Sequence, residues 1–374
     1  MIQWKPLAFH LVPVIVGCMR RPRFKAPEHF ESAIYHCVSR VVDRRKVLGP
    51  QEKEHFVRLM RLYERLYGLR IVTYCVMGNH FHILVEVPRR PETLPTDQAL
   101  VALVAETKGR EEAFWLEHWL THWRREGNHA AAEAERERWF RQMWDISQFM
   151  KVLKQRFSQW FNARQSGRRK GTLWEERFRS VLVEDGRALH AMAAYIDLNP
   201  LRAGLVKDPA DYRWSGYGEA AAGQKAGMSG LDRLAENLRR EGVAMEGGLL
   251  AWYREQLMGR EARRNGAQGP EQGEKVPAHD GGAGRERDAA GSAGKASPLG
   301  DSLRRRVRYF TDGAALGSRE FINAVFEARR GWFSARRRTG ARTLKGFGRA
   351  SPLQSLRSLR DLQKFPDDPG PAPT

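Results

Sequence analysis

The chain has 374 residues, of which 41% are hydrophobic and 10% aromatic, so it can bury a core and wholesale disorder is excluded. Its 64 Lys and Arg residues outnumber 44 Asp and Glu, and the net charge of +20 favours a polyanionic partner, above all nucleic acid, over a merely solvated surface. Three cysteines are too few for a disulfide framework, and no apolar run reaches the roughly 18 residues that span a bilayer. We therefore expect a cytoplasmic, nucleoid-associated protein with no membrane partner.

The start of the chain is expected to lie outside the main domain. The apolar run 7–18 is interrupted by His10 and Pro13 and lacks a small-residue cleavage site, which argues against a secretory signal. We predict an N-terminal extension over 1–32, with Met19 as the true start. Residues 33–220 carry dense periodic patterns and form the predicted main domain.

Four elements are predicted in the first part of this domain. They are a strand over 33–40, a helix over 51–67, and strands over 70–77 and 80–87. Gly68 ends the helix, and Gly78-Asn79 is a two-residue hairpin signal between the last two strands. The following residues, 91–142, have a helical and highly charged pattern, and we interpret them as an insertion.

Three further elements complete the domain. They are a helix over 145–163, a strand over 173–183 and a helix over 187–199. Asp145 can cap the first helix, and the last helix is predicted to stop at Pro200, because the residue before a proline disfavours helical geometry. The order of elements predicts an α+β fold in which a sheet carries helices on one face.

The rest of the chain divides by composition. We predict a helical extension over 221–259 and a flexible, Gly-rich linker over 260–300. Residues 301–350 are strongly basic, and Ser318 could cap a helix there, so we predict a small helical DNA-binding module. A basic disordered segment is the alternative for 301–350, and a disordered tail is predicted over 351–374.

A pair of histidines marks the third predicted strand. Strand alternation places the apolar residues Phe81, Ile83, Val85 and Val87 on the core face and His80, His82, Leu84 and Glu86 on the other. Two imidazoles on one face can bind one divalent metal, although a lone His-x-His is a weak motif and solvent-facing histidines are the alternative.

The remaining ligands of such a site are not evident from the sequence. No third histidine lies nearby in the chain, so an open site with water or substrate in the other positions is expected. Cys75 faces His82 across the hairpin but is interpreted as a packing residue. Glu86 could substitute as a ligand, although simple exposure is the favoured interpretation.

The last helix of the domain carries a second candidate pair. Tyr195 and Asn199 are four residues apart and therefore lie one above the other on a helix. A tyrosine hydroxyl can attack a phosphodiester, and an amide oxygen one turn away can bind a metal. The alternative for each residue alone is an ordinary boundary aromatic and a helix C-terminal asparagine.

Several motifs together resemble a known family. They are YHCVSR (35–40), YCVMGNHFHILVEVP (74–88), GTLWEERFRS (171–180), YIDLNPLRAGLV (195–206) and DYRWSGY (211–217). In this order they resemble the REP-associated tyrosine transposases, a branch of the single-tyrosine HUH transposases, over about residues 33–217. The HUH motif corresponds to His80, Phe81 and His82.

The resemblance implies a ferredoxin-like core, with Tyr195 as the nucleophile and His80, His82 and Asn199 as ligands of Mg²⁺ or Mn²⁺. Such enzymes cleave single-stranded DNA, often beside a hairpin. They form a covalent 5′-phosphotyrosine and free a 3′-hydroxyl, and the linkage is later rejoined without ATP. Related enzymes act as monomers or dimers, so the oligomeric state stays open.

Basic residues near these motifs are candidate contacts to the DNA backbone. They are Arg40, Arg44, Arg45, Arg168, Arg169, Lys170, Arg177 and Arg179. Trp174 and Phe178 could stack on unpaired bases, but we favour a place in the core for both.

The leading hypothesis is a metal-dependent DNA transposase that cleaves and joins single strands at hairpin or repeat DNA. The alternative is a catalytically silent regulatory protein that binds hairpin DNA. A rolling-circle replication initiator would share the histidine strand, but the run 195–204 favours the transposase.

Overall fold

The computed structural model describes residues 24–27, 30–164, 170–240, 242–259, 309–344 and 353–356. Within these residues one sheet has the strand order β2-β3-β1-β4-β5-β7-β6. The strands are β1 (Ser32–Arg40), β2 (Arg70–Val76), β3 (His80–Pro88), β4 (Arg179–Val183), β5 (Ala315–Gly317), β6 (Ala341–Thr343) and β7 (Gln354–Leu356). None of the helices in the described ranges is long and apolar enough to cross a membrane.

Strands β2-β3-β1-β4 form an antiparallel ferredoxin-like core, as the resemblance implies. Helix α1 (Pro50–Leu66) connects β1 to β2, and helix α5 (Ile146–Arg164) precedes β4. The predicted Gly78-Asn79 hairpin joins β2 and β3. The predicted strand over 173–183 is shorter in the structure, because β4 begins only at Arg179.

Helices α1 and α5 cover the predicted core face of the sheet. Glu52 accepts a hydrogen bond from the Gly49 N–H at the start of α1, and Gly68 ends the helix with a φ of 61°. Asp145 caps α5 as predicted, because its Oδ1 accepts from the backbone N–H groups of Ser147 and Gln148. Buried apolar side chains from both helices, including Phe56 and Phe157, meet the sheet in one hydrophobic cluster.

The opposite face of the sheet is also covered, which differs from the predicted one-sided arrangement. Helices α6 (Arg187–Asp197), α8 (Gly216–Ala221), α9 (Lys225–Arg240) and α10 (Leu249–Met258) pack there. This second layer forms because the face carries buried apolar residues such as Ile34, Leu84 and Val181. Close approach of α9 to β2 depends on Gly230, where an added Cβ would lie 2.3 Å from the Val72 carbonyl oxygen.

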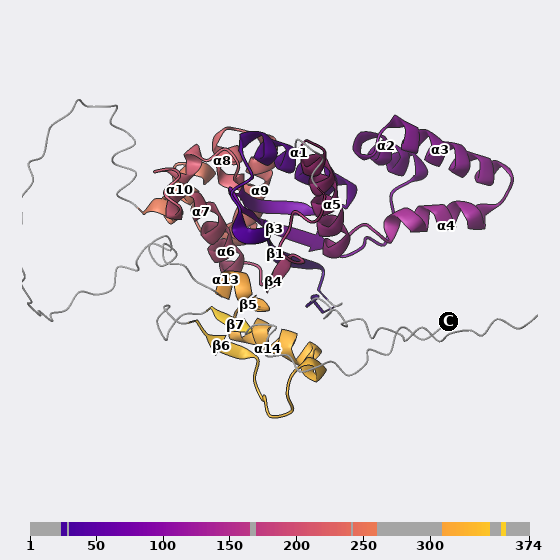
Figure 1. Ribbon diagram of the computed structural model, residues 1–374. Coiled ribbons are helices and arrows are strands. Elements are labelled where there is room, and N and C mark those ends of the chain that lie inside the picture. The colour runs from indigo at the N-terminus through magenta and orange to yellow at the C-terminus, as the bar shows by residue number, and fades with distance from the viewer. Residues whose placement is uncertain are drawn as a thin grey trace, which may run out of the picture.

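The predicted insertion forms three helices that project from the body (Figure 1). They are α2 (Asp97–Thr107), α3 (Arg110–Arg125) and α4 (His129–Phe140). Buried Leu100, Leu116 and Leu120 give the insertion an apolar interior. Asp97 accepts hydrogen bonds from Arg124 and, at 2.6 Å, from Arg136, and so joins the three helices.

The end of the described chain, residues 309–344 with 353–356, is called the C-terminal segment below. It contains α13 (Tyr309–Asp312), β5, α14 (Arg319–Ala328), β6 and β7. The predicted Ser318 cap is present, since its Oγ accepts from the Phe321 N–H. The C-terminal segment also contains the short helix η3 (Arg330–Trp332), and short elements elsewhere are η1 (Val42–Arg44), α7 (Asn199–Arg202) and η2 (Pro209–Asp211).

The C-terminal segment differs from the predicted tethered helical module, because it extends the core sheet. Strand β5 lies parallel to β4, with Leu182 beside Ala315 and Val183 beside Leu316. The apolar strand β5 pairs with the otherwise open edge of β4. Strand β7 then pairs antiparallel with β5, and β6 pairs antiparallel with β7 (Figure 1). Strand β7 falls within residues 351–374, for which the sequence predicts a disordered tail. The predicted linker 260–300 and residues 1–23 are outside the described residues.

Candidate active site

The histidine strand β3 divides its side chains between the two faces of the sheet, as predicted. Phe81, Ile83 and Val85 join the cluster under α1 and α5, and His80 and His82 face the side of α6. The two imidazole centroids are 5.1 Å apart. His82 is only 2% exposed, which rules out the solvent-facing alternative for this residue, and His80 is half-buried.

A third histidine, which the sequence analysis missed, lies beside this pair. His36 on β1 stacks on His82 with ring centroids 5.1 Å apart, and its Nε2 lies 2.9 Å from His82 Nδ1. The correct register places Val38 opposite His82, so His36 is two residues further along the same face. Strand alternation could have shown that His36 faces one side, but not that the side is that of His82.

Hydrogen bonds assign the tautomers of these rings. His36 Nδ1 lies 2.6 Å from the Phe310 carbonyl oxygen, which can only accept, so Nδ1 carries a proton. Burial lowers the pKa of His36 to about 4, and the neutral ring therefore accepts at Nε2 from His82 Nδ1. Burial also lowers the pKa of His82, with smaller contributions from nearby charges, which leaves its Nε2 unprotonated.

His80 is oriented in a similar way by the hairpin turn. Its Nδ1 donates to Asn79 Oδ1 over 2.6 Å, and Asn79 Nδ2 in turn donates to the Arg44 carbonyl oxygen. The Nδ1 atoms of His80 and His82 are thus both anchored. This is the arrangement in which an outer partner fixes a metal-ligating imidazole.

Tyr195 lies on α6 beside the histidines, although 112 residues separate it from His82 in the chain. Its ring centroid is 6.1 Å from that of His82 and 6.3 Å from that of His36. Phe310 of the C-terminal segment stacks on the ring of Tyr195, with centroids 4.7 Å apart and an interplanar angle of 10°. As a result Tyr195 is only 4% exposed, and α13 covers it.

The tyrosine helix ends two residues earlier than predicted, and Pro200 belongs to a second short helix rather than to a helix stop. Helix α6 ends at Asp197, and α7 (Asn199–Arg202) continues after Leu198. Pro200 is tolerated because it lies in the first turn of α7, where its missing N–H has no helical partner to lose. Asn199 Nδ2 donates to the carbonyl oxygens of Tyr195 and Ile196, and the amide therefore stays beside the tyrosine.

The described residues include no group of three His, Cys, Asp or Glu side chains that could hold a metal. The predicted ligand set is different in kind, with two imidazoles and the amide oxygen of Asn199. Imidazole nitrogens and an amide oxygen are donor types that divalent cations accept. Both Nδ1 atoms are anchored, and the amide oxygen has a second lone pair beyond the one that Arg202 uses.

The other two candidate ligands, Cys75 and Glu86, are both engaged by other side chains. Cys75 is fully buried, burial raises the pKa of its thiol, and its Sγ contacts Met77 Sδ at 3.5 Å, so it packs as predicted. Glu86 accepts two hydrogen bonds from Arg233, at 2.8 and 2.9 Å, and one from Ser32. The interpretation of Glu86 as simply exposed is therefore wrong, because a buried guanidinium holds it.

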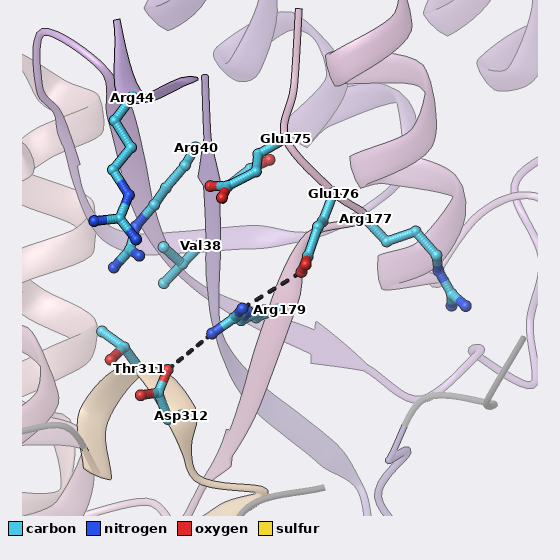
Figure 2. Close-up of a pocket in the computed structure, with 10 residues that line it drawn as sticks. Val38, Arg40, Arg44, Glu175, Glu176, Arg177, Arg179, Thr311 and Asp312 are labelled. Atoms are coloured by element: carbon cyan, nitrogen blue, oxygen red, sulfur yellow. Dashed lines mark hydrogen bonds and ion pairs between the residues drawn. The ribbon is translucent and has the colours of Figure 1, made fainter. Parts of the chain in front are cut away.

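Four of the predicted DNA contacts line one pocket of about 60 Å³ (Figure 2). They are Arg40, Arg44, Arg177 and Arg179. Arg40 stands opposite His80 in the β1–β3 register, so the pocket adjoins the histidines. Asp312 of α13 pairs with Arg179 at 3.0 Å and closes one side of the pocket, and Glu176 pairs with Arg179 at 3.4 Å.

The other predicted contacts are placed differently. Arg45 and Lys170 are exposed but do not line this pocket, and Arg168 and Arg169 lie outside the described residues. Trp174 and Phe178 are buried in the cluster under α1 and α5. The preference for a core role for these two aromatics is confirmed.

Residues 29–119 match the family model described as Transposase IS200 like. The match confirms the transposase resemblance. It includes His36, His80 and His82 and ends before the helix that carries Tyr195. No curated protein matches the chain. A solved structure described as "Structure of the REP associates tyrosine transposase bound to a REP hairpin" is 14% identical, with a TM-score of 0.34 over 54% of this chain and 84% of that chain.

Proposed function

We propose that the protein cleaves and rejoins single strands at hairpin or repeat DNA, as a metal-dependent transposase with Tyr195 as nucleophile. The observation that carries the proposal is the proximity of the Tyr195 phenol to His82, with ring centroids 6.1 Å apart. The family match and the pocket of four arginines, of which Arg40 stands opposite His80, support the same function.

In the proposed reaction the Tyr195 oxygen attacks the phosphorus of a phosphodiester. The new bond joins that oxygen to phosphorus while the bond from phosphorus to the 3′-oxygen breaks. The phenol loses its proton, the 3′-oxygen gains one, and nothing is oxidised or reduced. Reversal with a different 3′-hydroxyl joins two strands and needs no nucleotide cofactor.

His80, His82 and Asn199 would hold Mg²⁺ or Mn²⁺ in this site. The bound cation would polarise the phosphate and stabilise its developing charge. The pocket of Arg40, Arg44, Arg177 and Arg179 would bind the adjoining DNA backbone through charge-assisted hydrogen bonds. His36 orients His82 through the hydrogen bond between the rings.

Access to Tyr195 requires that α13 move. Phe310 stacks on the phenol, and Asp312 occupies Arg179 at the edge of the arginine pocket. The C-terminal segment therefore lies where the DNA of the proposed reaction would bind. Displacement of α13 by DNA would open both the nucleophile and the pocket in one movement.

A covalent-adduct assay tests the proposal. The substrate is a pool of hairpin oligonucleotides with randomised single-stranded flanks and a 3′ label, incubated with the full chain and MnCl₂ or MgCl₂. Because the 3′ fragment stays on the tyrosine, we expect label to migrate with the denatured protein. Tyr195→Phe should lower adduct formation by at least about 1,000-fold without loss of DNA binding.

Tyr217→Phe is the matched control, since Tyr217 is another buried tyrosine of the same cluster and should leave the adduct yield unchanged. EDTA should abolish the adduct, and added MnCl₂ should restore it. An adduct that persists in Tyr195→Phe would exclude Tyr195 as the nucleophile.

The burial of Tyr195 favours one alternative, a catalytically silent protein that binds hairpin DNA. This alternative predicts tight binding of the same oligonucleotides with no metal-dependent adduct under any condition. It also predicts that Tyr195→Phe changes nothing that can be measured. The adduct assay therefore separates the two functions directly.

A further inference from the structure

Arg202 occupies a position in the site that the reaction described above does not use. Tyr195, Asn199 and Arg202 stand at positions i, i+4 and i+7, which fall on one side of a helix. Because α7 continues the chain past Pro200 for one more turn, Arg202 returns over the tyrosine. The continuation of the helix is therefore what brings this guanidinium to the site.

Three contacts fix the guanidinium there. Its Nη2 donates to the Tyr195 carbonyl oxygen and to Asn199 Oδ1, both at 2.8 Å. Its Cζ lies 4.1 Å from the centroid of the Tyr195 ring, which is a cation–π contact. One side chain thus holds the backbone and the ring of Tyr195 and the amide of Asn199.

A purely structural explanation accounts for part of this arrangement. The last carbonyl groups of a helix lack intrahelical partners, and a cation at the helix C-terminus is favourable. A capping role requires only a donor to the Tyr195 carbonyl oxygen. It does not require a flat group over the phenol ring or a hydrogen bond to the Asn199 side chain. Both hydrogen bonds come from Nη2, and the planar guanidinium that carries it lies over the ring, which a lysine ammonium would not reproduce.

The charge of Arg202 also reaches the histidines. The Arg202 Cζ lies over the Tyr195 ring, and the centroid of that ring is 6.1 Å from the centroid of the His82 ring. The guanidinium is therefore close to the nucleophile, to the amide ligand and to the buried imidazole. Any phosphate that approaches Tyr195 and His82 together would meet this positive charge.

We propose that Arg202 is a positioning residue for strand cleavage, which fixes the Tyr195 phenol and the Asn199 amide and places positive charge beside the attacked phosphate. This inference rests on the proposed function. It concerns the chemical step rather than DNA affinity, because the backbone of the DNA is bound by the separate arginine pocket. Loss of Arg202 should therefore slow adduct formation and leave the dissociation constant nearly unchanged.

The test compares Arg202→Gln, Arg202→Lys and the control Arg213→Gln in the full chain. Arg213 is an exposed arginine paired with Glu54 and does not touch the site. The single-turnover adduct rate is measured with the same 3′-labelled hairpin pool and MnCl₂, and binding is measured by fluorescence anisotropy. Thermal unfolding is recorded for each variant.

We expect Arg202→Gln to lower the adduct rate about 100-fold, with the dissociation constant within about threefold of the wild type. Arg202→Lys keeps the charge without the planar guanidinium and should recover about tenfold of that loss. Arg213→Gln should match the wild type. This split between rate and binding, with partial rescue by lysine, is what a capping role alone would not produce.

Other outcomes overturn the inference. If the adduct rate of Arg202→Gln is within threefold of the wild-type rate while Tyr195→Phe is inactive, Arg202 has no positioning role. The proposed function is unaffected by that outcome. Equal losses of rate and binding in both variants, in step with a lower melting temperature, assign a capping role only. If Arg202→Gln does not fold, the test rests on Arg202→Lys. An adduct rate of Arg202→Lys equal to that of the wild type would then overturn the assignment of Arg202 as a positioning residue. Absence of any wild-type adduct ends the proposed function and this inference with it.

Discussion

The α2–α4 insertion and the C-terminal segment are both additions to the ferredoxin-like core, but only one of them reaches the candidate site. The insertion extends the apolar cluster under α1 and α5 with residues such as Leu116 and Leu120 and projects away from the body (Figure 1). The C-terminal segment instead adds three strands to the sheet and places Phe310 on Tyr195. Periodicity and charge predict that a segment is ordered, but not which surface it will cover.

The largest expected effect is on the docking of the C-terminal segment, when an apolar side chain that packs it against the core is replaced by a charged one. Leu316 on β5 is fully buried, and Leu316→Asp should cost on the order of 4 kcal/mol of the docking free energy, because a carboxylate would be buried without a partner. Limited proteolysis should then cleave within 309–344 while the core stays intact. Leu120→Asp is the counterpart and should expose the insertion to protease without releasing the C-terminal segment.

An intermediate effect on the adduct rate is expected when the side chain of Phe310 is truncated while α13 stays in place over Tyr195. Phe310→Ala removes the ring stacked on Tyr195 and should raise the adduct rate about fivefold, since an aromatic pair contributes about 1 kcal/mol beyond its buried area. The measurement is the single-turnover adduct rate at saturating DNA. Trp119→Ala in α3 should leave that rate unchanged, and a slower Phe310→Ala enzyme would contradict the view of α13 as a cover.

The smallest effect concerns one ion pair. Asp312→Asn frees Arg179 from a half-exposed salt bridge and should tighten DNA binding only about two- to threefold, because such pairs contribute less than about 1 kcal/mol. Anisotropy titrations at low salt would show the change. Asp97→Asn breaks ion pairs of Arg124 and Arg136 in the insertion and should have no effect on binding, so equal shifts in both variants would indicate a nonspecific charge effect.

Local patterns predicted much of the core. Alternation along β3 correctly separated Phe81 from His82, and the Gly78-Asn79 turn fixed the hairpin. The helical stripe and the capping Asp145 located α5 closely. These features depend on residues a few positions apart, which is the range in which periodicity and capping act.

The features that escaped prediction depend on pairing between distant residues. His36 needed the register of β1 against β3, and the place of β5 needed the free edge of β4, more than 100 positions away. Glu86 has the sequence context of an exposed residue, but Arg233 from α9 reaches it. Each of these outcomes depends on which surfaces meet, and the sequence pattern of either partner alone does not contain that information.

The parallel pairing of β4 with β5 has a consequence for the order of events during synthesis. Joining Leu182 to Ala315 closes a long loop, and this contact is available only after α10 has left the ribosome. At about 10 residues per second, translation of the stretch between α10 and β5 takes roughly five seconds. During that interval a nascent chain has its tyrosine helix and histidine strands complete but has not yet received the ring of Phe310.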